Sequence, residues 1–366
     1  MSTVWLPCGD YHQDYAEDQG WWQARFIKFK MILLLAVVFI GIPQFLPEYY
    51  VSVGTMVGYT AMGALGVQLL IGFTGLITLG HAAFIAVGAY TSTLLVLQFP
   101  WPGFIVDWGL AYPISILVAA IAAGLWSVLF GLPSAKVKGF YLILTTMAAQ
   151  FITVDFILTQ YVSQIGGRGQ AFSLPPGVIK IGPWAIDTDL KIYYLMAVLL
   201  TLMVIVLANL LRSKPGRAWV AIRDNDIAAE ALGINIVRYK LLAFFVAGFF
   251  AGLAGAFWVS NTAALSPEHF PWFWSLWLVG VILIGGVGSI HGAIFGALFM
   301  VLVMEGLQWA VIPMSEYFPR MLMAFASIKD AAFGLAICAF LIYEPNGLAY
   351  RWWQAKNYFN LWPFSY

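Results

Sequence analysis

The stretch YYVSVGTMVGYTAMGALGVQLLIGFTGLITLGHAAFIAVGAYTSTLLVLQFPWPGFIV, residues 49–106, contains no Asp, Glu, Lys or Arg. A helix needs about 20 predominantly apolar residues to cross a bilayer, so this stretch has room for two membrane spans. The whole chain has a similar character, because 62% of its 366 residues are hydrophobic and only 10% are charged. A soluble domain carries about 25% charged residues. The sequence therefore predicts an all-α polytopic membrane protein and excludes a soluble enzyme.

The charge and the cysteines exclude further classes of protein. The formal net charge of +1 provides no basic field that could hold a polyanion, so no nucleic-acid partner is expected. The two cysteines, Cys8 and Cys338, are too few for a disulfide framework and are not spaced as metal ligands. We therefore predict no metal and no cofactor in this chain. We expect membrane lipid to surround it.

The intervals between charged residues predict about ten membrane-spanning helices. These helices form a transmembrane domain over 28–350, between a polar N-terminal tail, 1–27, and an aromatic-rich C-terminal tail, 351–366. One span plus a re-entrant segment is the alternative to two spans within 273–312. The ten predicted spans are 31–46, 51–71, 75–97, 110–132, 140–160, 191–211, 240–260, 273–288, 291–312 and 330–343.

The positions of Lys and Arg predict the orientation, because short loops rich in these residues stay in the cytoplasm. With ten spans, both tails and the most basic loop fall on one side of the membrane, so both termini are predicted to be cytoplasmic. The N-terminal tail lacks the basic region and cleavage site of a signal peptide. The basic groups on the predicted cytoplasmic side are Arg25, Lys28 and Lys30, then Lys136 and Lys138, then Arg212, Lys214, Arg217, Arg223, Arg238 and Lys240, then Arg351 and Lys356.

Two glycine-rich segments, 70–81 and 285–291, interrupt the predicted spans, and each ends in a His followed by small residues. Interrupted helices at corresponding positions of two halves point to the pathway of a transporter. The similarity of the two segments is either an internal repeat or chance. The residues predicted to line a translocation pathway are Thr74, Gly75, Thr78, His81, Gly285, Gly286, Gly288 and Ser289.

Four ionisable residues lie within predicted spans. Such groups are costly in hydrocarbon, so each faces the bundle interior, a wet cavity, a subunit interface or the headgroups. A structural role in a hydrogen-bonded position and a functional role toward substrate or protons are both open for each of them. These residues are His81, His291, Asp155 and Glu305.

The loop 212–239, RSKPGRAWVAIRDNDIAAEALGINIVRY, is the most informative polar segment. Pro215 and Gly216 end the sixth predicted span. Asp224 or Asn225 can cap a single short helix over 224–233, and Gly233 can stop it in a left-handed conformation. Its polar face is mixed in sign, which favours docking into a groove of another protein over lying flat on lipid. Its expected apolar face consists of Ile227, Ala228, Ala231 and Leu232.

Residues 216–235 resemble the coupling loop of permeases from branched-chain and hydrophobic amino-acid ABC importers. The segments 72–84, 251–256 and 285–289 are similar to other motifs of that family, and the larger, M-type permease is the better match. The resemblance implies an ABC-importer permease bundle with a cytoplasmic coupling helix that contacts an ATPase. The residues expected to make or shape that contact are Arg217, Arg223, Asp224, Asp226, Glu230 and Gly233.

The resemblance also implies partners in a bacterial-type inner membrane. These are a second homologous permease, two cytosolic ATP-binding subunits and an extracytoplasmic substrate-binding protein. The chain has no Gly-x-x-x-x-Gly-Lys-Ser/Thr loop, so ATP and Mg are expected on the partner subunits and this chain is a non-catalytic translocation subunit. Branched-chain or other hydrophobic amino acids are the expected substrates, with amides such as urea and aromatic acids left open. A heterodimer of permeases is expected, and a homodimer is the alternative.

Two other classes of protein remain to be weighed. An ATP-independent carrier or channel needs intramembrane charges in a chain or ring, and few are present. A membrane-embedded enzyme needs a catalytic set, such as paired metal ligands at helical spacing, and none is evident. The importer permease is therefore the main hypothesis, with the ATP-independent carrier or channel as its alternative.

Overall fold

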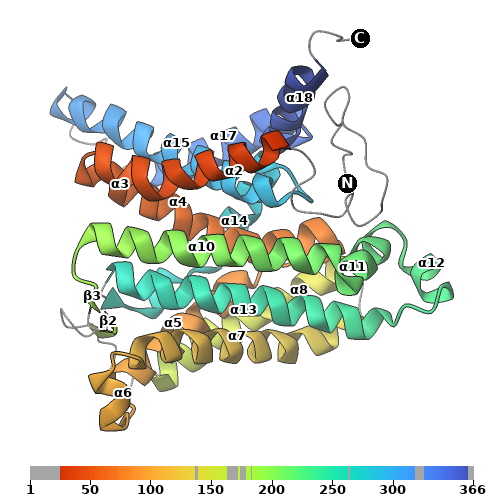
Figure 1. Ribbon diagram of the computed structural model, residues 1–366. Helices are drawn as coiled ribbons and strands as arrows, with labels where there is room; N and C mark the ends of the chain where they lie inside the picture. The colour runs from red at the N-terminus through yellow and green to blue at the C-terminus, as the bar shows by residue number, and fades with distance from the viewer. Residues whose placement is uncertain are drawn as a thin grey trace.

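The computed structural model describes residues 25–136, 139–162, 172–173, 179–182, 184–262, 264–317 and 325–361. Within these ranges the chain is a bundle of long helices (Figure 1), so the predicted all-α polytopic fold is confirmed. The longer α-helices are α2 (Arg25–Ala36), α4 (Glu48–Val67), α5 (His81–Leu97), α7 (Ala111–Lys136), α8 (Phe140–Gln150), α10 (Asp189–Arg212), α11 (Lys214–Asp224), α13 (Ile236–Thr262), α14 (Trp272–Gly285), α15 (Ile290–Tyr317), α17 (Phe325–Tyr343) and α18 (Gly347–Leu361).

Shorter elements extend or connect these helices. Three are π-helical, and two of them, η2 (Gln68–Phe73) and η3 (Phe151–Val162), continue α4 and α8 without a break. The strands form two antiparallel pairs, β1 with β4 and β2 with β3. The remaining short elements are η1 (Val37–Gly41), α3 (Ile42–Phe45), α6 (Gly103–Asp107), α12 (Asp226–Ala231), η4 (Pro267–His269), β1 (Phe172–Ser173), β2 (Lys180–Ile181), β3 (Trp184–Ala185) and β4 (Ala264–Leu265).

The number of spans agrees approximately with the predicted ten. Seven helices in the described residues are long and apolar enough to cross a membrane, and α17 with α18, bent by 45° at their junction, would make an eighth. Two shorter apolar helices, Met31–Phe45 and His81–Leu97, correspond to the first and third predicted spans. The segment 273–312 holds two long helices, α14 and α15, rather than one span and a re-entrant segment.

The third span was predicted to begin at residue 75, but α5 begins at His81. The chain between η2 and α5 is irregular because its glycines adopt positions that a helix does not allow. Gly75 has a φ of 70°, in the left-handed region. Gly80 lies so close to the carbonyl oxygen of Thr146 that a methyl group there would collide with it.

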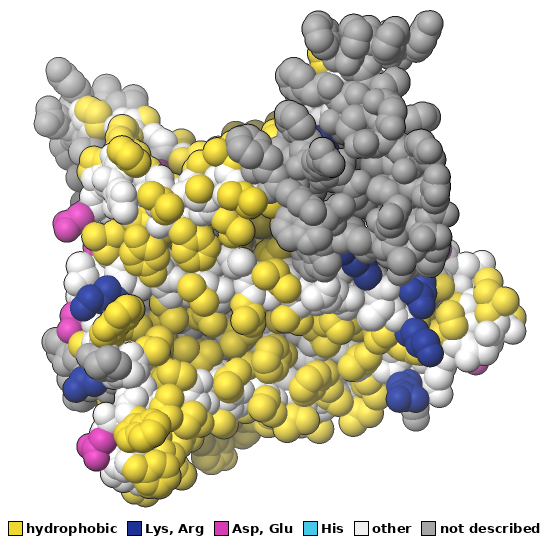
Figure 2. Space-filling model, in the orientation of Figure 1, with side chains coloured by type: hydrophobic (Ala, Val, Ile, Leu, Met, Phe, Trp, Pro, Cys, Tyr) yellow, Lys and Arg dark blue, Asp and Glu magenta, His cyan; other side chains and the backbone are white. Residues whose placement is uncertain are grey.

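The bundle has two ends of different character (Figures 1 and 2). One end carries α6, β2 and β3, and the other carries α11, α12 and α18. Hydrophobic side chains cover the middle of the face seen in Figure 2, and charged side chains lie toward its edges, with Lys and Arg beside α11. We name the end that carries α11, α12 and α18 the coupling end.

Helices α5, α7 and α13 pack against one another through small residues. Lipid is as apolar as leucine, so helices associate in a membrane through close van der Waals contact rather than through the hydrophobic effect. Gly88 of α5 lies against Gly252 of α13, and a methyl group on Gly88 would overlap the backbone of Gly252. A methyl group on Gly252 would lie 2.7 Å from the Cα atom of Ala120 in α7. The three helices can therefore approach one another this closely only because Gly88 and Gly252 have no side chains.

We expect Gly252→Ala to lower the thermal unfolding midpoint of the protein in detergent. The added methyl group forces α7 and α13 apart, and overpacking of this kind costs about 1–3 kcal/mol. Gly306 in α15 has no atom within 4 Å of the added methyl group and provides the matched control. Gly306→Ala should keep or slightly raise the midpoint, because alanine favours helices over glycine by about 1 kcal/mol. Equal midpoints for the two variants would contradict the packing argument.

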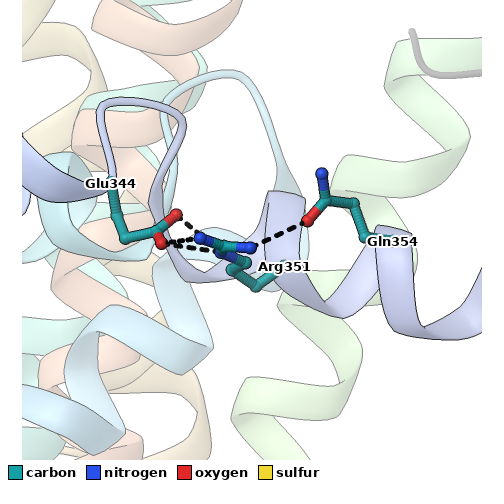
Figure 3. Close-up of polar contacts among 3 residues, drawn as sticks. All are labelled: Glu344, Arg351 and Gln354. Carbon is teal, nitrogen blue, oxygen red and sulfur yellow. Dashed lines mark hydrogen bonds and ion pairs between the residues drawn. The ribbon is translucent and has the colours of Figure 1, made fainter.

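Helix α18 lies against the ends of α14 and α15. Its first residue, Gly347, has a φ of 72°, and a methyl group there would lie 2.5 Å from the amide nitrogen of Gly286. Arg351 donates from Nε to both carboxylate oxygens of Glu344 at 2.7 Å and from Nη1 to Gln354 Oε1 at 3.3 Å (Figure 3). The predicted boundary between residues 350 and 351 thus falls inside α18. Residues 1–24 and 362–366 of the predicted tails lie outside the described residues.

The ion pair predicts how α18 responds to acid. Hydrogen bonds from the Arg351 guanidinium hold the pKa of the Glu344 carboxyl below its ordinary value of 4.5. A group with a lowered pKa stabilises the folded state above its ordinary pKa, and this contribution is lost as pH falls through the lowered value. We expect the fluorine NMR signal of fluorotryptophan at Trp352 to shift below pH 4.5, and Glu344→Gln to remove that shift. The same titration in both proteins would assign the change to another group.

Candidate functional site at the coupling end

The loop 212–239 folds into two helices, α11 and α12, rather than the single helix predicted. Helix α10 ends at Arg212, and Ser213 has an extended backbone that turns the chain into α11. Pro215 lies in the first turn of α11, where the amide hydrogen that it lacks would have no helical partner. The same residue therefore ends one helix and begins the next, which a helix-stop pattern alone does not reveal.

Trp219 fixes α11 against the bundle. Its side chain is fully buried, and its Nε1 donates to the carbonyl oxygen of Tyr239 in α13 at 2.9 Å. Ala218 and Ile222 are buried beside it on the same face. Sequence analysis did not single out Trp219, although these three residues recur at helical spacing. Trp219 therefore holds helix α11 against the bundle, and the last two residues of this helix are Arg223 and Asp224.

Helix α12 projects from the coupling end (Figure 1). The side-chain oxygen of Asn225 accepts a hydrogen bond from the Ala228 amide at 3.1 Å and caps the helix. Gly233 has a φ of 83°, so the chain leaves α12 through the left-handed turn that the sequence predicted. The helix is shorter than the predicted 224–233. Ile227 and Leu232 are 72% and 82% exposed, so most of the predicted apolar face is not covered by this chain.

We expect Gly233→Ala to loosen α12. No atom lies within 4 Å of the added methyl group, so the cost arises from the left-handed backbone alone and amounts to about 1–2 kcal/mol. Amide hydrogen exchange over 226–235 should become faster in this variant. Gly233→Asn is the matched control and should exchange at close to the wild-type rate, because asparagine tolerates this conformation. Unchanged exchange in Gly233→Ala would mean that another contact holds the turn.

The two glycine-rich segments meet at the coupling end. Gln68, buried in η2, donates from Nε2 to the carbonyl oxygens of Gly286 at 3.1 Å and Ser289 at 2.8 Å. Gly72 lies against Gly288, and a methyl group on Gly72 would lie 2.6 Å from the Gly288 amide nitrogen. We name the contact among these five residues the break junction. In it, a side chain from one interrupted helix donates to the Gly286 carbonyl at the end of α14 and to the Ser289 carbonyl, which also accepts from the Gly292 amide at 3.0 Å.

Arg223 reaches the break junction from the end of α11. Its Nη1 donates to the carbonyl oxygen of Gly72 at 2.9 Å. Its Nε and Nη2 donate to Oδ1 of Asp224 at 3.0 Å and 2.9 Å. The Gly72 carbonyl belongs to the C-terminal turn of η2, where carbonyl groups lack helical partners. The guanidinium therefore links the loop 212–239 to both helix interruptions.

Comparison with known proteins identifies the family. The profile described as "Branched-chain amino acid transport system / permease component" matches residues 49–327. This chain belongs to that family. It is 28% identical over 301 residues to the high-affinity branched-chain amino acid transport system permease protein LivM of Salmonella typhimurium and of Escherichia coli, which covers 76% of this chain and 68% of each relative. It is 25% identical over 318 residues to the autoinducer 2 import system permease protein LsrC of Escherichia coli, which covers 85% of both chains.

No solved structure matches the chain significantly. The family and the two kinds of relative make this chain a permease subunit of an ABC importer for small solutes, as the coupling-loop motif predicted. The family match includes the break junction, α11 and α12, and it ends before α18.

The predicted pathway residues of the permease lie in and beside the two helix interruptions, and several are buried within the chain. Thr74 Oγ1 donates to the Leu70 carbonyl at 2.5 Å, and the side chains of Thr78 and His81 are fully buried. Gly75 is exposed and touches Arg223. A role in translocation stays a prediction for the whole set, which is Thr74, Gly75, Thr78, His81, Gly285, Gly286, Gly288 and Ser289.

The two interruptions have similar backbone features but different surroundings. Each contains glycine with a positive φ, and each is followed by a helix with a His in its first turn. His81 begins α5 and is fully buried beside Phe84. His291 is the second residue of α15, is exposed and lies beside Phe295. The two histidines therefore occupy corresponding positions in the chain and different environments.

The predicted ATPase contacts differ in where the structure places them. Arg217 donates from Nη1 to the Arg212 carbonyl oxygen at 3.0 Å, on the exposed side of α11. Asp226 lies in the first turn of α12, where the positive end of the helix dipole stabilises a carboxylate. Glu230 is exposed. Arg223 instead directs its guanidinium toward the break junction. An ATPase contact stays a prediction for Arg217, Arg223, Asp224, Asp226, Glu230 and Gly233.

The two carboxylates in spans have unlike environments. Glu305 Oε2 accepts a hydrogen bond from the Tyr49 hydroxyl at 2.6 Å, and that hydroxyl accepts one from Trp309 Nε1 at 2.9 Å. Asp155 is exposed on η3. In the part of the chain that the structure describes, no three His, Cys, Asp or Glu side chains are grouped so that they could hold a metal ion. A role for either carboxylate in transport stays open.

Proposed function

We propose that this permease imports branched-chain or other hydrophobic amino acids, and that separate ATP-binding subunits drive it by docking on α12. The observation that carries the proposal is the uncovered apolar face of α12. Ile227 and Leu232 lie at the polar coupling end, outside the apolar middle of the bundle, so lipid tails do not cover them. An amphipathic helix exposed in this way fits a groove on a partner protein.

The polar residues of α12 support a protein partner. A helix that lies on a lipid surface carries a Lys- or Arg-rich polar face. The polar side chains of α12 are instead acidic, Asp226 and Glu230, while Arg223 just before it reaches into the bundle. ATP and Mg would be bound by the docked subunits, since this chain carries no phosphate-binding loop motif. Closure of the ATP-binding subunits would then switch the permease between outward-facing and inward-facing states.

The basic residues support an orientation with the coupling end in the cytoplasm. Loops that carry Lys and Arg remain on the cytoplasmic side of a membrane. Both termini would lie on that side of a bacterial-type inner membrane, and a substrate-binding protein would dock at the opposite end, which carries α6, β2 and β3. The basic residues around α11 and at the start of α13 are Arg212, Lys214, Arg217, Arg223, Arg238 and Lys240.

A second, homologous permease would complete the pathway. A cavity between α5, α7 and α13, lined in part by Ser92, Tyr112 and Ser260, has a volume of about 10 Å³. That volume holds one water molecule and no amino acid. This cavity is therefore not the solute pathway, which we place at a surface shared with the second permease.

The names of the relatives support the substrate class. The LivM relatives are branched-chain amino acid permeases, whereas the LsrC relative is an autoinducer 2 import permease. The LivM proteins are slightly more similar in sequence, and the family profile carries the branched-chain amino acid description. Branched-chain and other hydrophobic amino acids are therefore the substrates to test first.

The test is co-purification of the ATP-binding subunits with the permease in mild detergent. The double variant Ile227→Glu/Leu232→Glu should retain at least about tenfold less of these subunits, because carboxylates are costly in an apolar groove. Val237→Glu is the matched control, since Val237 is 42% exposed at the start of α13, and it should retain them. Unchanged retention by the double variant would exclude α12 as the docking helix. A wild-type chain that purifies alone and moves solute into liposomes without nucleotide would favour the carrier or channel alternative.

A further inference from the structure

Three consecutive residues connect the exposed helix α12 to the break junction, in which Gly288 and Ser289 are half-buried and the other three residues are buried. Arg223 donates to Gly72, Asp224 holds the Arg223 guanidinium, and Asn225 caps α12. No linker intervenes, because the three residues are consecutive, and Arg223 and Asp224 are the last two residues of α11, beyond its anchor at the buried Trp219. A displacement of α12 therefore acts on the Arg223 side chain within a few bonds.

The Arg223 side chain fits its position through its planar shape. Two of its nitrogens face Asp224 and the third faces Gly72, which uses the fixed directions of a guanidinium. Its aliphatic part lies against Gly75, where an added methyl group would be 3.1 Å from Arg223 Cγ. Gly75 has no side chain that would crowd this stem, and its left-handed φ disfavours other residues at this position.

Arg223 also touches the second interrupted segment. A methyl group on Gly288 would lie 3.3 Å from Arg223 Nη1 and 3.3 Å from the Gly72 carbonyl oxygen. The guanidinium thus sits where η2 meets the turn between α14 and α15. Its withdrawal removes a charged donor from Gly72 and opens one side of the contact to water.

We propose that Arg223 is a positioning residue that transmits the movement of α12 to the break junction and thereby controls separation of the two interrupted helix pairs at the coupling end. With the guanidinium in place, η2 and the turn of residues 286–289 stay in contact. When α12 moves with a docked ATPase, the guanidinium leaves Gly72 and the two segments part. The inference rests on the proposed function, because it requires a partner on α12.

The test measures the accessibility of the break junction in the assembled transporter. Ser289→Cys is introduced into a chain with Cys8 and Cys338 replaced by serine, and a water-soluble thiol reagent is added with and without ATP plus vanadate. We expect the labelling rate to change with nucleotide in this protein. Adding Arg223→Gln should raise the nucleotide-free rate about tenfold and remove the response, because a charge-assisted hydrogen bond at Gly72 is lost.

Two further variants make the test specific. Arg223→Lys keeps the charge and most of the aliphatic stem but lacks the planar guanidinium. The protein should therefore fold, and the change of labelling rate with nucleotide should become smaller. Arg238→Gln changes an exposed arginine at the same end that makes no contact with the break junction among its described interactions, and its response should be unchanged. Solute uptake per ATP hydrolysed should fall in parallel with the response in both Arg223 variants.

The outcomes separate this inference from the proposed function. A wild-type complex that retains its ATP-binding subunits but shows no nucleotide response at position 289 would overturn the inference alone. Arg223 variants with a wild-type response would do the same. Loss of the ATP-binding subunits from a folded Arg223→Lys permease would make Arg223 a docking contact and also overturn it. Failure of the wild-type chain to retain ATP-binding subunits would instead refute the proposed function.

Discussion

Where a helix is interrupted, the backbone carbonyl groups that lose their helical partners need other hydrogen-bond donors, because an unpaired buried carbonyl is costly. Two interruptions of this kind meet in the permease, after η2 and after α14. Gln68 of the first donates to Gly286 and Ser289 of the second, and Arg223 donates to Gly72. Each interruption is therefore stabilised by a residue from outside it. This mutual dependence joins the bundle, the breaks and the loop 212–239 into one structural unit.

Helix α18 also packs closely against the second interruption. The turn of residues 286–289 lies between two glycines from other parts of the chain, Gly72 on one side and Gly347 on the other. The backbone segments touch without intervening side chains, so a shift of the turn must move both neighbours or break contact with one. Helix α18 lies beyond the residues that match the family profile, yet its first residue packs against a turn that lies within that match.

Local patterns in the sequence revealed much of the fold, and long-range contacts explain what they missed. Charge-free intervals identified the membrane spans, and Asn225 and Gly233 behave as helix-capping residues because capping depends on near neighbours alone. The late start of α5 depends on Thr146, which is distant in sequence from Gly80. The inward direction of Arg223 was not predicted for the same reason, since an arginine next to an exposed helix is equally compatible with a docking contact. The family was recognised from residues 216–235, whereas the meeting of the two interruptions required the structure.

The charge of Arg223 has a physical reason beyond a single hydrogen bond. Helix η2 ends at Phe73 and α14 ends at Gly285, and both C-termini converge on the break junction. Each helix C-terminus carries about −0.5 of an elementary charge, so the two ends repel each other, and the N-terminus of α15, which begins at Ile290, offsets part of this charge. The amide of Gln68 reduces this repulsion through its dipole, and the guanidinium of Arg223 adds a full positive charge beside Gly72. Asp224 holds that charge in place from the solvent side, where its own field is screened. A neutral side chain could replace the hydrogen bond to Gly72, but it would leave two like-charged helix ends in contact.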